Sequence, residues 1–185
     1  MTTLDRLLTL LALDSLPRTG WIQAGVPDPE SIAAHSLGAA LVALTTADAV
    51  EPPLDVDRCV ALCTVHDVPE ALLGDLPRPA AQLLPEGAKR AAERGAAAQL
   101  LGGADGTAAQ RWAEYDAGQT REARFARACD KLHLGLRALG YARAGLGNLH
   151  GFERTVAELE CREFAPLEEL RGAIASALTE SLARR

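Results

Sequence analysis

An all-α fold, built as a single compact helical bundle, is the fold class that this sequence predicts. Apolar residues make up 48% of the 185 residues, which is enough to bury a sizeable core and argues against disorder. Much of this apolar content is Ala and Leu, which favour helices, whereas aromatic residues make up only 4% and other strand formers are few. Apolar residues also recur at helical spacing in several segments, so we expect helices that each bury one face.

The N-terminal part of the chain predicts two helices separated by a loop. Leucines recur at helical spacing in the opening segment, at positions 4, 7, 8 and 11, and this helix should end near Pro17. Prolines and glycines make the stretch from Leu16 to Pro29 a loop. A second helix should begin at Pro29-Glu30-Ser31, where Glu30 would complement the positive end of the helix dipole. Its apolar stripe consists of Leu37, Ala40, Leu41 and Leu44.

A third helix should follow Pro52-Pro53, with Asp55 or Asp57 as its cap. One face of this helix would carry Cys59, Leu62, Cys63 and His66. Pro69 lies within the helix or just past it, and its ring would free the carbonyl of Val65 from a helical hydrogen bond.

The rest of the chain predicts further helices joined by turns. A Pro-rich loop over 74–87 precedes a helix over 88–101, and a short helix should run through Trp112. A long helix then carries Phe125, Cys129, Leu132, Leu136 and Leu139. A turn or hinge over 145–151 precedes a last helix, which carries Leu167, Leu170, Ile174 and Leu178. Because no linker or repeat is visible, we expect one domain over 1–185, with a motif-bearing core at about 4–141 and helices over 150–185 packed on it.

Charge and cysteine content narrow the class of protein. The formal net charge of −6 disfavours a long nucleic acid as partner, although a metal or a local cation could still hold one mononucleotide. The four cysteines form no CxxC pair, so a thiolate zinc site is not expected, and we interpret them as buried small apolar residues. The N-terminus does not resemble a signal peptide and no apolar run looks long enough to span a membrane, so we expect a cytoplasmic protein.

The segment His66-Asp67-Val68-Pro69-Glu70, followed by Gly74-Asp75, carries the most chemical information. An imidazole and a carboxylate on adjacent residues can bind one divalent cation. Glu70 lies one helical turn further along, so its carboxylate falls on the same side of the helix. An adjacent His-Asp pair alone is weak evidence, because such pairs also occur by chance on protein surfaces.

Two further candidate ligands lie on other predicted helices. His35 lies on the second helix and Asp130 on the long helix. Asp130 follows the apolar stripe at Cys129, where an unpaired carboxylate would be costly to bury. Taken singly, His35 could be an ordinary core histidine and Asp130 could pair with a nearby arginine such as Arg127.

Taken in order, these motifs resemble the HD-domain superfamily of metal-dependent phosphohydrolases, and within it the 5′-deoxynucleotidase branch. The resemblance rests on four segments, which together extend over roughly Leu4 to Tyr141. They are Leu16-Pro17-Arg18-Thr19-Gly20-Trp21, Pro29-Glu30-Ser31-Ile32-Ala33-Ala34-His35, His66-Asp67-Val68-Pro69-Glu70-Ala71-Leu72-Leu73-Gly74-Asp75 and Asp130-Lys131-Leu132.

The resemblance implies a 5′-nucleotidase that removes the 5′-phosphate from nucleoside monophosphates. Deoxynucleoside monophosphates are the expected substrates. It also implies one divalent metal ion per chain (Co, Mn, Mg, Zn or Fe) and a homodimer. The residues to which it assigns roles are the metal ligands His35, His66, Asp67 and Asp130, the catalytic residues Glu70 and Asp75, and the substrate-binding residues Arg18 and Trp21.

The sequence departs from the family pattern at two positions. Ala34 stands where a Glu usually precedes the first metal-binding His, and His133 stands where a Glu often follows Asp-Lys-Leu. Neither position is an expected ligand, but both would alter the surroundings of the metal. For His133 and His150 a structural role is favoured, and Lys89 and Arg90 are interpreted as a solvated helix start.

Three alternatives stay open. A two-iron oxidase of the same superfamily would need more histidines between the His-Asp pair and the last Asp, and none lies between Asp67 and Asp130. A modified nucleotide, a cyclic nucleotide or a triphosphate would use the same metal site. A non-catalytic nucleotide-binding helical protein would retain the motif but release no phosphate.

Overall fold

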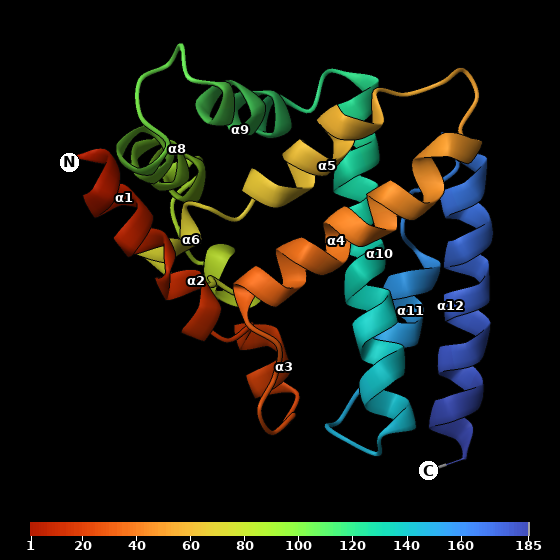
Figure 1. Ribbon diagram of the computed structural model, residues 1–185. Coiled ribbons are helices and arrows are strands. Elements are labelled where there is room, and N and C mark those ends of the chain that lie inside the picture. Colours follow the sequence, from red (N-terminus) through yellow and green to blue (C-terminus); the bar gives the residue numbers. More distant parts are fainter. Residues whose placement is uncertain (185) are drawn as a thin grey trace.

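Helices make up the regular structure of the chain in the computed structural model, which describes residues 1–184 (Figure 1). In chain order the elements are α1 (Thr3–Leu10), α2 (Ala12–Ser15), α3 (Thr19–Gln23), α4 (Ile32–Thr46), the 3₁₀ turn η1 (Ala47–Ala49), α5 (Val56–Val65), α6 (Glu70–Leu73), α7 (Arg78–Ala81), α8 (Ala88–Leu100), α9 (Thr107–Ala117), α10 (Arg121–Arg143), α11 (Phe152–Ala157) and α12 (Ala165–Ala183). Residues 1–184 contain no β-strand, which confirms the predicted all-α bundle.

The long helix α10 forms the centre of the bundle. It packs against α4 and α5 on one side and against α11 and α12 on the other, and Figure 1 shows it running between α4 and α12. Alanines such as Ala39 and Ala43 on α4 are fully buried, because their small side chains let the two helix backbones approach closely. This arrangement brings Asp130 of α10 next to the helices that carry the His residues.

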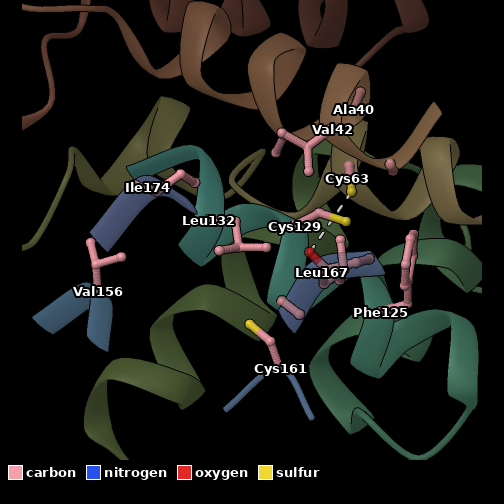
Figure 2. Close-up of a cluster of buried hydrophobic side chains, with 14 of the residues drawn as sticks. Ala40, Val42, Cys63, Phe125, Cys129, Leu132, Val156, Cys161, Leu167 and Ile174 are labelled. Carbon is pink, nitrogen blue, oxygen red and sulfur yellow. Dashed lines mark hydrogen bonds between the residues drawn. The ribbon is translucent and has the colours of Figure 1, made fainter. Parts of the chain in front are cut away.

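A buried cluster of apolar side chains holds the bundle together. Figure 2 shows Phe125 and Leu132 of α10 with Leu167 and Ile174 of α12 in this cluster. All four cysteines are free and buried, as the sequence predicts, and Cys63 donates a weak hydrogen bond to the carbonyl of Ala126 at 3.8 Å. The cysteines therefore serve as small core residues.

Two leucine stripes do not face the core. In α1 no residue is buried, and in α4 the stripe residues Leu37, Leu41 and Leu44 are exposed by 62%, 50% and 52%. Apart from Ile32 and His35, the core side of α4 consists of smaller residues, and among the stripe residues only Ala40 is buried. The sequence stripes therefore predict the helices correctly but not the faces that they bury.

The segment Ile32–Ala49, which consists of α4 and η1, is long and apolar enough to cross a membrane by length and composition alone. The expectation that no segment passes this test was therefore wrong. Its inner side packs against α5 and α10, as in the core helix of a bundle, which makes it unconvincing as a membrane span.

Local details of the loops also differ from the expectation. The stretch from Leu16 to Pro29 contains the short helix α3, and α4 begins at Ile32 with Ser31 as its cap, so that Pro29 and Glu30 lie before its first turn. Asp55 is the cap of α5, where its side chain accepts a hydrogen bond from the Arg58 N–H. An isolated antiparallel bridge between Pro17 and Ser31 ties the ends of this loop together and fixes the position of the residues between them.

Candidate metal centre

The His66-Asp67 pair lies at the end of α5, where the helix stops because Pro69 cannot continue it. Residues 66–69 form a turn before α6, in which the Glu70 N–H donates to the Asp67 carbonyl at 2.9 Å. The Trp112 indole of α9 donates to the His66 carbonyl at 3.2 Å and so replaces a lost helical partner. This turn directs the His66 and Asp67 side chains toward the same space.

The structure brings the four predicted ligands from α4, the end of α5 and α10 to one place. The Nε2 atom of His35 lies 2.9 Å from Asp130 Oδ1, and the Nε2 atom of His66 lies 3.7 Å from the same oxygen. Asp67 Oδ2 lies 3.1 Å from His66 Nε2 and 3.9 Å from His35 Nε2. Two imidazole nitrogens and two carboxylate oxygens therefore share a space small enough for one cation.

The hydrogen bonds of His66 show that this space suits a cation. Its Nδ1 atom lies 2.7 Å from the carbonyl oxygen of Cys63, which can only accept, so Nδ1 carries the proton. Its Nε2 atom is buried and has no hydrogen-bond partner. In the neutral ring, a lone pair at Nε2 therefore faces the oxygens of Asp67 and Asp130, and such a set of donors fits a divalent metal.

The electrostatics of the cluster also favour a positive charge. Burial by itself would lower the pKa of His66, but the Asp67 and Asp130 carboxylates outweigh it and raise that pKa above its usual range. Burial would likewise raise the pKa of Asp130, yet its contacts with His35 and His66 hold it well below the usual range. Without a metal, a proton on His66 supplies the positive charge that the carboxylates stabilise, and a bound cation would supply positive charge at the same place.

Glu70, at the first turn of α6, lies beside the cluster with its carboxyl group almost fully buried. Its Oε2 atom has no hydrogen-bond partner and lies 3.9 Å from Arg18 Nη1. Burial, reinforced by Asp67, raises the pKa of Glu70 to about 9. A cation in the cluster would favour its ionised form, and the carboxylate could then accept a proton from a nearby water.

Arg18 reaches the cluster from the loop before α3. The bridge between Pro17 and Ser31 positions it, because the Arg18 N–H donates to the Glu30 carbonyl at 3.0 Å. Its Nη1 atom donates to Asp67 Oδ2 at 3.0 Å and lies 3.8 Å from Asp75 Oδ1. The guanidinium group of Arg18 therefore lies next to the carboxylates of the cluster, and the Arg18 side chain is only 18% exposed.

Asp75 follows Gly74 and contacts the same loop. Its Oδ2 atom accepts a hydrogen bond from the Thr19 N–H, and the Thr19 hydroxyl donates to its backbone carbonyl at 2.9 Å. These two bonds join the end of α6 to the start of α3. They leave the Oδ1 atom of Asp75 facing Arg18 and the open space beyond it.

Trp21 is too deeply buried to present the whole face of its ring to a substrate. It is only 3% exposed, its Nε1 atom donates to Glu30 at 2.9 Å, and its ring stacks on Phe152 with a centroid distance of 5.0 Å. Glu30 also accepts a hydrogen bond from Arg137 at 3.0 Å. The predicted role of Glu30 at the helix dipole was therefore wrong, because its carboxylate points inward and orders Trp21 and Arg137.

A cavity of about 590 Å³ opens beside the cluster. It is large enough for a small molecule such as a mononucleotide. Its wall carries carboxylates and Arg18 as well as apolar and amide side chains. The residues that line it are Arg18, Gly20, Trp21, Gln23, Ala24, Asp67, Glu70, Asp75, Leu76, Pro77, Pro79, Lys89, Asp130, Leu134, Asn148 and Phe152.

Several residues of this site escaped the sequence analysis. Tyr115 of α9 donates its hydroxyl to Asp130 Oδ2 at 3.2 Å, and no motif marks it. Asn148 and Phe152 line the cavity although the segment after Tyr141 carried no signal. Lys89 also lines it, whereas the sequence indicated a solvated helix start. Glu30 could have been found, since it belongs to the Pro-Glu-Ser segment that carries the resemblance.

His133 lies on α10 next to the cluster, and His150 is exposed and outside the cavity lining. The Nδ1 atom of His133 lies 3.0 Å from the Nδ1 atom of His35. Burial, with His35 and Arg137 nearby, lowers the pKa of His133 to about 3, so its ring is neutral. A neutral imidazole can accept one hydrogen bond and donate another.

Comparison with known proteins agrees with this geometry. The HD domain family matches residues 12–161. Relatives named 5′-deoxynucleotidase HDDC2 from Xenopus laevis and Bos taurus are 37% and 34% identical over 133 residues, which is 70% of this chain. The match spans only 64% and 62% of the length of those two relatives.

Solved structures extend the likeness over almost the whole chain. The crystal structure of the PH0347 protein from Pyrococcus horikoshii OT3 superposes with a TM-score of 0.82 at 29% identity, and the match covers 94% of this chain and 99% of that one. A conserved hypothetical protein from Pyrococcus furiosus superposes with a TM-score of 0.77 at 29% identity, over 94% and 98% of the two chains.

Proposed function

The chain belongs to the HD domain family, and on that premise we propose that it is a metal-dependent phosphohydrolase that removes the 5′-phosphate from nucleoside monophosphates, with deoxynucleotides as the expected substrates. One observation carries the proposal. The unpartnered Nε2 atom of His66 faces the Asp67 and Asp130 carboxylates at the edge of a cavity that also contains Arg18. The names of the HDDC2 relatives support the choice of substrate class.

In this proposal His35, His66, Asp67 and Asp130 hold one divalent metal ion. Two imidazoles and two carboxylates suit Co, Mn, Zn or Fe, and the carboxylates also suit Mg, so the ligand set does not select one metal. When bound, the ion would supply Lewis-acid chemistry, since it would polarise a phosphoryl group and make a nearby water more acidic. All the remaining steps fall to side chains of the chain itself.

Glu70 would orient the attacking water and take up its proton. Its Oε2 atom is free of hydrogen bonds and borders both the cluster and the cavity, so it is positioned as a base. Arg18 would bind the phosphate with its planar set of donors, as guanidinium groups do with phosphate oxygens. Its present partners, Asp67, Glu70 and Asp75, keep it from swinging away from the cavity.

Asp75 and Trp21 would act on the sugar side. The Oδ1 atom of Asp75 is the one left available by Thr19, so it would accept a hydrogen bond from the sugar or protonate the leaving oxygen. Trp21 would contribute one edge of the wall near the sugar, with Phe152 stacked behind it. The apolar and amide groups at Leu134, Gln23 and Asn148 would then surround the base.

Phosphate release from a panel of deoxy- and ribonucleoside monophosphates, with several divalent metals and with chelator, tests this function. We expect release from monophosphates that depends on metal and is abolished by Glu70→Ala while the metal still binds. Glu158→Ala, which changes an exposed carboxylate that does not line the cavity, serves as the control. Near-normal turnover by Glu70→Ala would contradict the proposed role of Glu70. Phosphate release only from cyclic nucleotides or triphosphates would show that the substrate class is a different one.

We further propose that the protein is a cytoplasmic homodimer. The exposed leucines of α1 and α4 offer apolar surface that a monomer would leave in water, and a second copy of the chain would bury it. Leu41→Glu is expected to convert a dimer to a monomer in light scattering at micromolar concentration. A monomeric wild-type protein in the same measurement would reject the dimer.

A further inference from the structure

His133 is the residue that sets the orientation of His35, and the geometry points to a pair, His133 and Gly38, that together decide how tightly the chain holds its metal. This inference rests on the proposed metal site but not on the reaction. Its basis is the contact of 3.0 Å between the Nδ1 atoms of His35 and His133, the burial of both rings, and the absence of a side chain at residue 38.

The proton positions in this pair follow from the metal site. To bind a cation through Nε2, His35 must carry its proton on Nδ1. That N–H then donates to the Nδ1 lone pair of His133, so His133 carries its own proton on Nε2. The hydrogen bond fixes both the tautomer of His35 and the rotation of its ring, which points Nε2 at Asp130.

Glu30 does not perform this task, although it is the nearby carboxylate. Its oxygens lie 3.9 Å from His35 Nδ1 and 3.9 Å from His133 Nε2, which is too far for a hydrogen bond. Its Oε1 atom accepts from Trp21 and its Oε2 atom from Arg137. Glu30, His35 and His133 lie close enough together to hold a second cation. Such a cation is unfavourable, because Trp21 and Arg137 already donate hydrogen bonds to the two oxygens of Glu30.

Gly38 makes room for the His133 ring. A Cβ atom built on Gly38 of α4 would overlap the imidazole of His133, with Nε2 as the nearest atom. Any larger residue at position 38 would therefore displace the ring from the position in which it contacts His35. Residue 38 and residue 133 thus form one unit across the contact between α4 and α10, and a mutation at either should act through the same hydrogen bond.

The first test compares His133→Leu with His133→Asn, which have nearly the same shape. The amide oxygen of Asn can accept the His35 Nδ1–H, whereas Leu cannot. Loss of such a partner typically weakens metal binding about 10- to 100-fold. We expect that loss for His133→Leu, measured by competition of Co²⁺ or Mn²⁺ with a chromophoric chelator, and affinity within about threefold of wild type for His133→Asn. Equal affinities of the two variants would overturn the role of His133.

The second test is a double-mutant cycle on metal affinity. Gly38→Ala alone should weaken metal binding, but it should have no further effect in a His133→Ala background, where the methyl group fills the space of the missing ring. Gly140→Ala, on α10 with open space around it, is the control and should bind metal as wild type does. Equal losses from Gly38→Ala in both backgrounds would show that Gly38 acts independently of His133.

These measurements need no substrate, so their outcome is separate from the proposed reaction. If wild-type protein binds metal but releases no phosphate from any nucleotide, the proposed function fails while the positioning role stands. If His133→Leu does not fold, the Gly38→Ala cycle decides the question by itself.

Discussion

Tyr115 and Asp130 are joined by a hydrogen bond of 3.2 Å from the phenol to Oδ2, while the other oxygen of Asp130 lies 2.9 Å from His35 Nε2. Burial, together with Asp130, raises the pKa of Tyr115 well above its usual range, so the phenol keeps its proton near neutral pH. One oxygen of Asp130 is therefore held by α9 and the other is presented to the cluster.

Tyr115→Phe should weaken metal binding moderately, by less than about tenfold, because Asp130 loses one of the groups that orient it. The chelator competition described for His133 measures this. Gln110→Ala, an exposed change on the same helix, should leave the affinity unchanged. Unaltered affinity in Tyr115→Phe would mean that His35 alone is sufficient to place the carboxylate.

Arg18→Lys should raise KM for nucleoside monophosphates by about 10- to 100-fold, because Lys presents a single point charge where Arg offers a planar fork to the phosphate. Steady-state phosphate release measures KM and kcat separately. Arg154, which is 81% exposed on α11, gives the matched control Arg154→Lys. A purely structural role of Arg18 would instead lower the melting temperature and leave KM as it is.

Metal removal should lower thermal stability. A ligand that binds only the folded state at 100 times its Kd adds about 2.7 kcal/mol, which corresponds to a rise of about 5–10 °C in melting temperature for a chain of this size. Differential scanning fluorimetry with Mn²⁺ or Co²⁺ and then with excess chelator measures the shift. The shift should disappear in His66→Ala, and its persistence there would place the ion elsewhere.

Trp21→Phe should destabilise the fold by about 1–3 kcal/mol, because the buried Glu30 carboxylate loses the indole donor. Urea denaturation measures the free energy of unfolding. Ile22→Val, on the same short helix but 50% exposed, should change it little. Equal stability of Trp21→Phe and wild type would mean that Arg137 alone compensates Glu30.

Stability should also depend on pH through Glu114, which joins α9 to α5 and to the start of α10. Burial by itself would raise the pKa of Glu114, but hydrogen bonds from Thr120 and Arg58 outweigh it and hold the pKa below the usual range. A lowered pKa in the folded state stabilises the protein at pH above the unfolded value of about 4.3, and this contribution is lost as pH falls through the folded value.

Glu114→Gln should therefore be less stable than wild type by about 1 kcal/mol at pH 7, and the difference should shrink as pH falls below the unfolded pKa toward the lower folded pKa. Urea denaturation at pH 7, 5 and 3.5 follows this. Glu158→Gln, with a carboxylate exposed by 71%, provides the control. A difference that persists unchanged at low pH would show that Glu114 acts through its shape and not through its charge.

Residue pattern alone predicted the helices, because Ala- and Leu-rich segments with helical spacing leave few other ways to bury apolar surface. The order of His35, the His66-Asp67 pair, Glu70 and Asp130 also named the groups that now lie together. This was possible because such chemistry needs particular atoms, and only a few residue types carry them. The buried cysteines followed from their apolar neighbours in the same way.

The leucine stripes show where pattern reached its limit. Spacing tells which residues share a face of α4, but not whether another helix covers that face. Here α5 and α10 pack against the side that carries the alanines. Likewise, the side chain of Glu30, which precedes the Ser31 cap of α4, could point to solvent or inward, and only the positions of Trp21 and Arg137 determine its direction.

The sequence by itself determined the helical class and the chemical groups of the site, since both follow from local composition and from residue identity. Only the tertiary structure decided that Tyr115, His133 and Gly38 belong to the site, because their roles depend on contacts between α4, α9 and α10. Hydrogen bonds and steric contacts act over a few ångströms in space, and separation along the chain does not reveal which residues will come that close.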